Sequence, residues 1–331
     1  GPPIGVQLSL LFADKIFSFL GFRLVMCLGV PMLSSALVFS SLTINPLIFA
    51  ISLMLGGFAI GILEVAVNLE ADRIEYKINK KIMNRSHSFW SLGFFCSGLT
   101  GALFSQMQIS PFINFSLSLI FGTALTILFC IKYKPAEMRP NLNSNNSLFV
   151  IPTRAVMGLV ILTLSPMLLE SASIDWSVIY MRDVFSTPPF LNGMAIVMVA
   201  LTQFSIRYYA DQFVEIYGSD IISKISIIAM FIGVTLVFFS NFPYLSLIGF
   251  AFIGGGSAVL FPLAMSAAAQ KTDRSAASNV ASLAQISFLI FLLAPPFLGY
   301  IAENFGIRIS FGIGLPLIIL SWLFVSSLKS K

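Results

Sequence analysis

The sequence is poor in charge, in cysteine and above all in histidine. Charged residues make up 10% of its 331 positions and hydrophobic residues 57%, and the mean hydropathy is +0.93. Soluble domains hold roughly 25% charged residues, so this composition excludes an ordinary globular protein and indicates one that crosses a membrane many times. The net charge of +5 comes from Lys and Arg in short loops between apolar stretches. It therefore gives no reason to expect a nucleic-acid partner.

The scarcity of reactive side chains also limits the chemistry. The three cysteines, Cys27, Cys96 and Cys130, lie far apart within apolar stretches, and His87 is the only histidine. No metal-binding spacing or disulfide framework emerges, so we expect lone buried thiols, no metal and no cofactor. No nucleophile has a recognisable partner base, so we assign no catalytic residue and do not expect an enzyme.

Long apolar stretches dominate the chain instead. A membrane-spanning helix needs about 20 apolar residues, and eleven stretches qualify, split five and six by a polar segment over 132–152. We therefore predict an all-α polytopic membrane protein with an N-terminal bundle over 1–131, a linker over 132–152 and a six-helix bundle over 153–331. The expected spans are 1–20, 24–42, 46–67, 87–107, 111–131, 153–178, 189–209, 220–240, 243–267, 277–301 and 306–327.

The two halves of the sequence repeat at one offset. A shift of 197 residues superposes Ala13-Asp14 on Ala210-Asp211, Gly21 on Gly218, Pro46 on Pro243, Gly57 on Gly254 and Lys132 on Lys329. Fixed-period similarity in an apolar chain indicates a transporter built from two related bundles. The counterparts of residues 149–197 would precede Gly1, so we expect a twelve-helix design without its first helix. A protein with an odd number of helices is the alternative.

Basic residues predict the orientation. Seventeen of the 19 Lys and Arg fall in one set of alternate loops, and only Arg182 and Arg308 fall in the other. The positive-inside rule then places the linker and the C terminus in the cytoplasm.

The stretch over 56–101 carries the first candidate site. Glu64 and Asn68 lie four residues apart on an apolar helix, and His87 follows near the start of the next. Glu64 is ~27 Å into its helix at 1.5 Å per residue, a depth that we expect His87 to share. The two side chains together could pass a proton. Alternatively, Glu64 pairs with a loop residue such as Arg85, or His87 caps its helix.

A second candidate cluster lies on the helix that begins near Thr153. Glu170 and Asp175 are ~24 and ~31 Å from its start, in the outer half of the membrane, and we expect Glu170 to be functional. Asp175 is seven residues before Arg182, so an interfacial ion pair is the alternative account of Asp175. Pro166 could break the helix and change how these residues face.

A third candidate cluster closes the helix that begins at Pro189. Arg207 and Asp211 are four residues apart and could form a cytoplasmic gate together with Asp14 in the first half; a solvated surface pair is equally compatible. The glycine run over 254–256 indicates close helix packing.

These features resemble the major facilitator superfamily. The two-bundle repeat, the Ala-Asp turns that end in Gly and the long central linker are typical of it. Within it, the chain is similar to the fucose permease branch and its YbjJ-type bacterial inner-membrane proteins. The residues that carry this resemblance are Glu64-Val-Ala-Val-Asn68, Ile82-Met83, His87-Ser-Phe-Trp-Ser-Leu-Gly93, Glu170, Asp175-Trp176-Ser177, Tyr180, Arg207, Asp211 and Gly218.

The resemblance implies a proton-coupled transporter of a small polar, sugar-like solute. Glu64 matches a protonatable acid of fucose permeases, and His87 stands where a sugar-binding residue is expected. We expect a monomer in the bacterial inner membrane, with the solute, protons and the lipid bilayer as its partners. Two alternatives stay open: a proton-driven exporter of drugs or metabolites, and a membrane remnant that transports nothing.

Overall fold

The structure is a computed structural model that describes residues 1–78, 82–137 and 150–328. Those residues form twelve α-helices and one 3-10 helix, with no strand among them. Eight helical stretches are long and apolar enough to cross a membrane, and Ile307–Leu323 is a shorter apolar stretch. Each of the eleven predicted spans falls on helix, which confirms the all-α polytopic fold.

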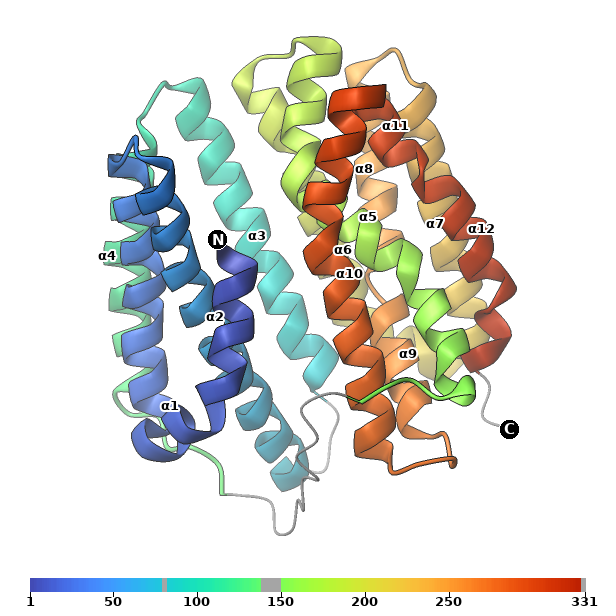
Figure 1. Ribbon diagram of the computed structural model, residues 1–331, viewed down its shortest axis with the longest axis horizontal. Coiled ribbons are helices and arrows are strands. Elements are labelled where there is room, and N and C mark those ends of the chain that lie inside the picture. The colour runs from blue at the N-terminus through green and yellow to red at the C-terminus, as the bar shows by residue number, and fades with distance from the viewer. Residues whose placement is uncertain (79–81, 138–149, 329–331) are drawn as a thin grey trace. The chain divides into compact units, whose positions relative to one another are not determined.

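The first compact unit spans residues 1–83 and 107–142. It contains α1 (Pro2–Leu42), α2 (Pro46–Ile78) and α4 (Pro111–Cys130), with α1 packed along both of the others (Figure 1). The predicted spans 1–20 and 24–42 are the two arms of α1, which breaks at Gly21. At the start of α2 the Asn45 side chain accepts a hydrogen bond from the Leu47 amide at 2.9 Å, and Pro46 occupies the first turn. These are ordinary helix-start signals.

The second compact unit spans residues 84–106 and 143–331. Its core surrounds Tyr180, which has no exposed surface and whose ring lies 5.6 Å from that of Phe250 and 5.3 Å from that of Phe311. Its helices are α3 (Met83–Gln106), α5 (Arg154–Phe185), α6 (Pro189–Tyr217), α7 (Ser219–Phe239), α8 (Pro243–Ser257), α9 (Leu260–Ala269), α10 (Ala276–Phe305), α11 (Ile307–Gly312) and α12 (Gly314–Leu323), and η1 (Val325–Leu328) follows (Figure 1).

Helix α3 belongs to the second unit because it packs closely on α6. A Cβ at Gly98 would lie 3.3 Å from side-chain atoms of Ile196 and Val197, and a Cβ at Gly193 would lie 2.5 Å from that of Ala102. Small residues thus let two helix backbones approach. The predicted boundaries at 131 and 153 stay a prediction, since residues 138–149 lie outside the described part.

Local packing repeats at the predicted offset. A Cβ at Gly57 would collide with the backbone carbonyl of Pro2, and a Cβ at Gly254 would collide with that of Val199. Since 2 + 197 = 199 and 57 + 197 = 254, the two contacts are images of each other. On the other side of the glycine run, a Cβ at Gly256 would meet the Ser226 carbonyl at 2.5 Å. The run therefore serves close helix packing, as predicted.

Several prolines of the second unit lie inside its helices. Helix α8 ends at Ser257 and α9 begins at Leu260, just before Pro262, while Pro295 and Pro296 lie inside α10. Helix α5 runs without interruption through Pro166. Because proline has no amide hydrogen, each leaves the carbonyl four residues earlier without its helical donor.

Candidate functional site

A buried ion pair between α5 and α6 forms the centre of the candidate site. The Nη2 atom of Arg207 lies 3.1 Å from both carboxylate oxygens of Glu170. The two side chains are only 13% and 12% exposed. Two charges held this far from water require close pairing and further hydrogen bonds.

Arg207 uses its other nitrogens to reach two more helical segments. Its Nη1 atom donates to the hydroxyl of Ser91 on α3 at 3.1 Å, and its Nε atom donates to the Ala258 carbonyl at 3.0 Å. Ser91 has no exposed surface. One turn earlier on α6, Gln203 donates to the Ser257 hydroxyl at 3.3 Å. The guanidinium thus connects α3, α5 and the break between α8 and α9.

His87 lies one helical turn before Ser91 on α3. It is close enough to Arg207 and Glu170 for both charges to act on its imidazole. The structure therefore brings together three of the predicted residues: His87, Glu170 and Arg207. The sequence placed them in three separate clusters.

Other predicted partners differ from those in the structure. Arg207 binds Glu170, 37 residues earlier, rather than Asp211 four residues on. Arg182 binds its neighbour Asp183 through Nε at 2.6 Å, so the ion-pair account of Asp175 is wrong. Asp175 instead accepts a 3.5 Å hydrogen bond from Ser171. The side chain of Asp14 lies outside the described residues, so its place in a gate stays a prediction.

Glu64 and Asn68 lie in the first unit, on α2. Both side chains are half-buried. Within the described part of its own unit, Glu64 forms no hydrogen bond or ion pair. The alternative pairing with Arg85, which belongs to the second unit, stays a prediction. The predicted relay between Glu64 and His87 joins the two compact units and stays a prediction.

Sequence reasoning missed a buried carboxylate at the end of α2. Glu70 is 3% exposed, and its Oε1 atom accepts hydrogen bonds from the Tyr133 hydroxyl at 2.7 Å and the Ala136 amide at 2.6 Å. Arg73 lies 3.5 Å from Oε2. Burial, together with the Glu70 carboxylate, raises the pKa of Tyr133 to about 12. The charged stretch over 70–77 was the only signal in the sequence, and it resembles any solvated loop.

Two of the three thiols are not lone, contrary to the prediction. The Cys130 thiol at the end of α4 is near enough to that of Cys27 on α1 to affect it, and both cysteines are free. Arg23, one turn before Cys27, donates to the carbonyl of Ile131 at 2.7 Å. The third thiol, Cys96 on α3, is exposed rather than buried.

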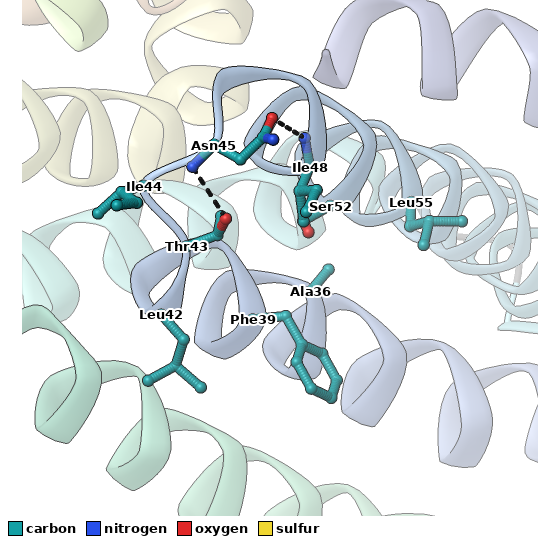
Figure 2. Close-up of a pocket in the computed structure, with 9 residues that line it drawn as sticks. All are labelled: Ala36, Phe39, Leu42, Thr43, Ile44, Asn45, Ile48, Ser52 and Leu55. Atoms are coloured by element: carbon teal, nitrogen blue, oxygen red, sulfur yellow. Dashed lines mark hydrogen bonds between the residues drawn. The ribbon is translucent and has the colours of Figure 1, made fainter.

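A hollow of about 590 Å³ lies between the end of α1 and the start of α2. Figure 2 shows the residues that line it. Its lining is mostly apolar, and two of its polar side chains, Thr43 and Asn45, already have local partners. Thr43 accepts a hydrogen bond from the Asn45 amide at 3.1 Å, and Asn45 caps α2. The hollow therefore offers little to a polar solute. It is lined by Ala36, Phe39, Leu42, Thr43, Ile44, Asn45, Ile48, Ser52 and Leu55.

Relatives of the chain are transporters. No family model matches it. It is 26% identical over 309 residues to the uncharacterized transporter y4wD of Sinorhizobium fredii, covering 93% of this chain and 81% of the relative. It is 25% identical over 289 residues to an uncharacterized MFS-type transporter of Yersinia pestis, covering 87% of this chain and 72% of the relative.

Solved structures agree on the fold. A D-xylose–proton symporter superposes with a TM-score of 0.72 at 14% identity, covering all of this chain and 87% of the other. The transporter FucP in its outward conformation superposes with a TM-score of 0.65 at 10% identity, covering all of this chain and 88% of the other. The nucleoside transporter NupG gives 0.65 at 14% identity, covering 99% of this chain and 89% of the other.

A bundle of apolar helices with charged groups buried inside it is compatible with a membrane transporter, and the two relatives named above are transporters rather than enzymes. The relatives and the fold narrow that class: the chain is similar to transporters of the major facilitator type, and its fold is that of FucP and of the D-xylose–proton symporter, as the resemblance implied.

Proposed function

We propose that this protein carries a small polar, sugar-like solute across the bacterial inner membrane by alternating access, coupled to the movement of protons. The observation that carries the proposal is Glu64. Its carboxylate is half-buried on a membrane-spanning helix, without an ion-pair partner among the described residues of its own unit. An ionisable group at such a place is expensive and is usually functional. Two proton symporters among the similar structures, for D-xylose and for fucose, support this proposal.

The other residues have complementary roles in the proposal. Glu64 carries the proton, and Asn68 lies one turn from it. His87, Ser91, Glu170 and Arg207 supply hydrogen-bond donors and acceptors of the kind that sugar hydroxyls require. Asp175 lies beyond this group on α5. Asp14 and Asp211, at equivalent positions of the repeat, are assigned to the cytoplasmic gate.

The excess of Lys and Arg in alternate loops supports a cytoplasmic linker and C terminus. We propose that the protein works as a monomer with the solute, protons and lipid as its partners. No nucleic acid enters the proposal.

Transport by the purified protein in proteoliposomes tests the proposal. We expect labelled sugars to exchange across the membrane without a proton gradient, and to accumulate only when an inward proton gradient is imposed. Extrusion under the same gradient would instead identify a proton-driven exporter. Absence of both exchange and accumulation over a panel of sugars and nucleosides would contradict the proposal and favour a remnant that transports nothing.

A further inference from the structure

Among the backbone carbonyls of the second unit that lack a helical donor because of a proline are those of Ala258 and Phe291. Pro262 follows Ala258 by four residues, and Pro295 follows Phe291 by four. A proline supplies no amide hydrogen, so neither carbonyl can form its regular helical bond. In a membrane interior, an unsatisfied carbonyl costs several kcal/mol unless another group donates to it.

Each of these carbonyls receives a side-chain donor. Arg207 donates through Nε to the Ala258 carbonyl at 3.0 Å. Ser171, which has no exposed surface, donates to the Phe291 carbonyl at 3.1 Å. The break between α8 and α9 is thus capped from α6, and the carbonyl of Phe291 inside the continuous helix α10 is capped from α5.

The two caps meet on adjacent residues of α5. Ser171 caps the Phe291 carbonyl of α10 directly, and its neighbour Glu170 holds Arg207, which caps the break between α8 and α9. Arg207 serves Glu170 and Ala258 at once, because its planar head presents donors on several sides. The charge of Glu170 therefore fixes the position of the Arg207 guanidinium, and through it the cap on Ala258.

We propose that Glu170 and Arg207 are positioning residues that set the bend between α8 and α9. When Glu170 loses its charge, Arg207 leaves the Ala258 carbonyl and the bend changes. We expect Ser171 to keep its hydrogen bond to the Phe291 carbonyl, because neither Glu170 nor Arg207 takes part in it. The carboxylate to which Ser171 also donates, at 3.5 Å, is that of Asp175. Among the described residues, two titratable or charged groups lie around Glu170. Arg207 forms the ion pair with it, and His87 is near enough for the charges of Arg207 and Glu170 to act on its imidazole. This inference rests on the proposed function, in which the solute binds at Glu170 and Arg207, and adds that the solute or a proton would neutralise Glu170 there.

Proline replacement tests the capping. Pro262→Ala restores an amide hydrogen for the Ala258 carbonyl and so removes the need for Arg207 there. We expect Arg207→Lys, which keeps the charge but loses the forked head, to lower the thermal unfolding temperature in detergent. In the Pro262→Ala background, the same substitution should cause less than half of that shift.

The carbonyl of Phe291, capped by Ser171, supplies the matched control. Pro295→Ala should rescue Ser171→Ala in the same way, and should leave the effect of Arg207→Lys unchanged. If the unfolding temperature of the double variant Arg207→Lys, Pro262→Ala is shifted by the sum of the two single-variant shifts, Arg207 does not cap the Ala258 carbonyl and the proposal is overturned.

A distance measurement tests the control by Glu170 without relying on transport. Spin labels at Leu245 on α8 and at Gln270 after α9, both exposed, would span the break in a chain whose three cysteines are replaced by serine. We expect Glu170→Gln to add a second distance to the distribution, and Ser171→Ala to leave it unchanged. A single unchanged distance in Glu170→Gln would overturn the proposal. A second distance in a protein that transports no solute would leave the proposal standing and contradict the proposed function alone.

Discussion

Gly21 and Gly218, separated by the 197-residue offset, adopt the same backbone conformation. Gly21 has φ 68° and ψ 169°, and Gly218 has φ 81° and ψ 155°. This region is essentially restricted to glycine. Each glycine joins two consecutive helical segments of its half, so the repeat extends to the geometry of the turn.

Alanine at either turn should destabilise the protein. We expect Gly21→Ala and Gly218→Ala each to lower the stability by about 1–3 kcal/mol. No described atom lies within 4 Å of the new Cβ at either position, so the cost comes from the backbone alone. Thermal unfolding in detergent measures the shift. Gly255→Ala is the control, because its Cβ would make ordinary 3.7 Å contacts with Ile206 and Thr202; equal shifts for all three variants would contradict the prediction.

The sequence predicts helices and repeats better than it predicts partners. Long apolar runs locate the helices because a membrane span has a minimum length. The pairing of Glu170 with Arg207 depends on how α5 and α6 are rotated about their axes, and uniformly apolar helices carry little periodic signal for that. The contacts of Glu70 with Tyr133, 63 residues away, and of Cys27 with Cys130 likewise follow from helix packing.

The Glu170–Arg207 pair should behave as one unit. Either Glu170→Ala or Arg207→Ala leaves an uncompensated buried charge, which costs about 3–5 kcal/mol. The double variant removes both charges, so it should lose less stability than the sum of the two single variants. A double-mutant cycle on thermal unfolding measures the difference.

The exposed pair of Arg182 and Asp183 is the control for that cycle. Its side chains are 63% and 47% exposed, and such pairs contribute about 0–1 kcal/mol. Additive losses at Glu170 and Arg207, equal in size to those at the exposed pair, would show that the buried pair is not formed.

Tyr133 should titrate about two pH units above an ordinary tyrosine. Its pKa is raised to about 12 by burial and by the Glu70 carboxylate, against about 10 for a free phenol. Because the folded-state value is the higher one, its contribution to stability is complete below about pH 10 and is lost as the pH rises through about 12. Ultraviolet difference absorbance of the phenolate, compared between the protein and Tyr133→Phe, isolates this group. A difference titration centred on the ordinary phenol value would contradict the contact with Glu70.

Cys27 and Cys130 should form a disulfide when the protein is treated with copper phenanthroline. Their two thiols would lose two protons and pass two electrons to the oxidant, joining α1 to α4. Thiol titration of the denatured protein should then find one free cysteine instead of three, and peptide mass spectrometry should identify it as Cys96. Cys130→Ser should keep both remaining thiols free. A disulfide to Cys96, or none in the unmodified chain, would contradict the packing of α1 on α4.

Glu64 is the group on which the proposed coupling depends. A carboxylate without a counter-charge is disfavoured inside a membrane, so we expect Glu64 to be neutral in at least one state of the transport cycle. Glutamine has nearly the same shape and is always neutral. It therefore imitates that state without removing a side chain.

Glu64→Gln should abolish proton-driven accumulation of the solute while leaving exchange intact, because exchange needs no net movement of protons. His87→Ala should instead weaken solute binding if His87 contacts the solute, or slow accumulation if it relays the proton. A structural role for Glu64 predicts a different pattern, in which Glu64→Gln lowers the folded yield and damages accumulation and exchange together. Both activities should be measured on one purified preparation of Glu64→Gln in proteoliposomes. Accumulation that persists at the unmodified level would remove Glu64 from the mechanism, and with it the principal support for proton coupling.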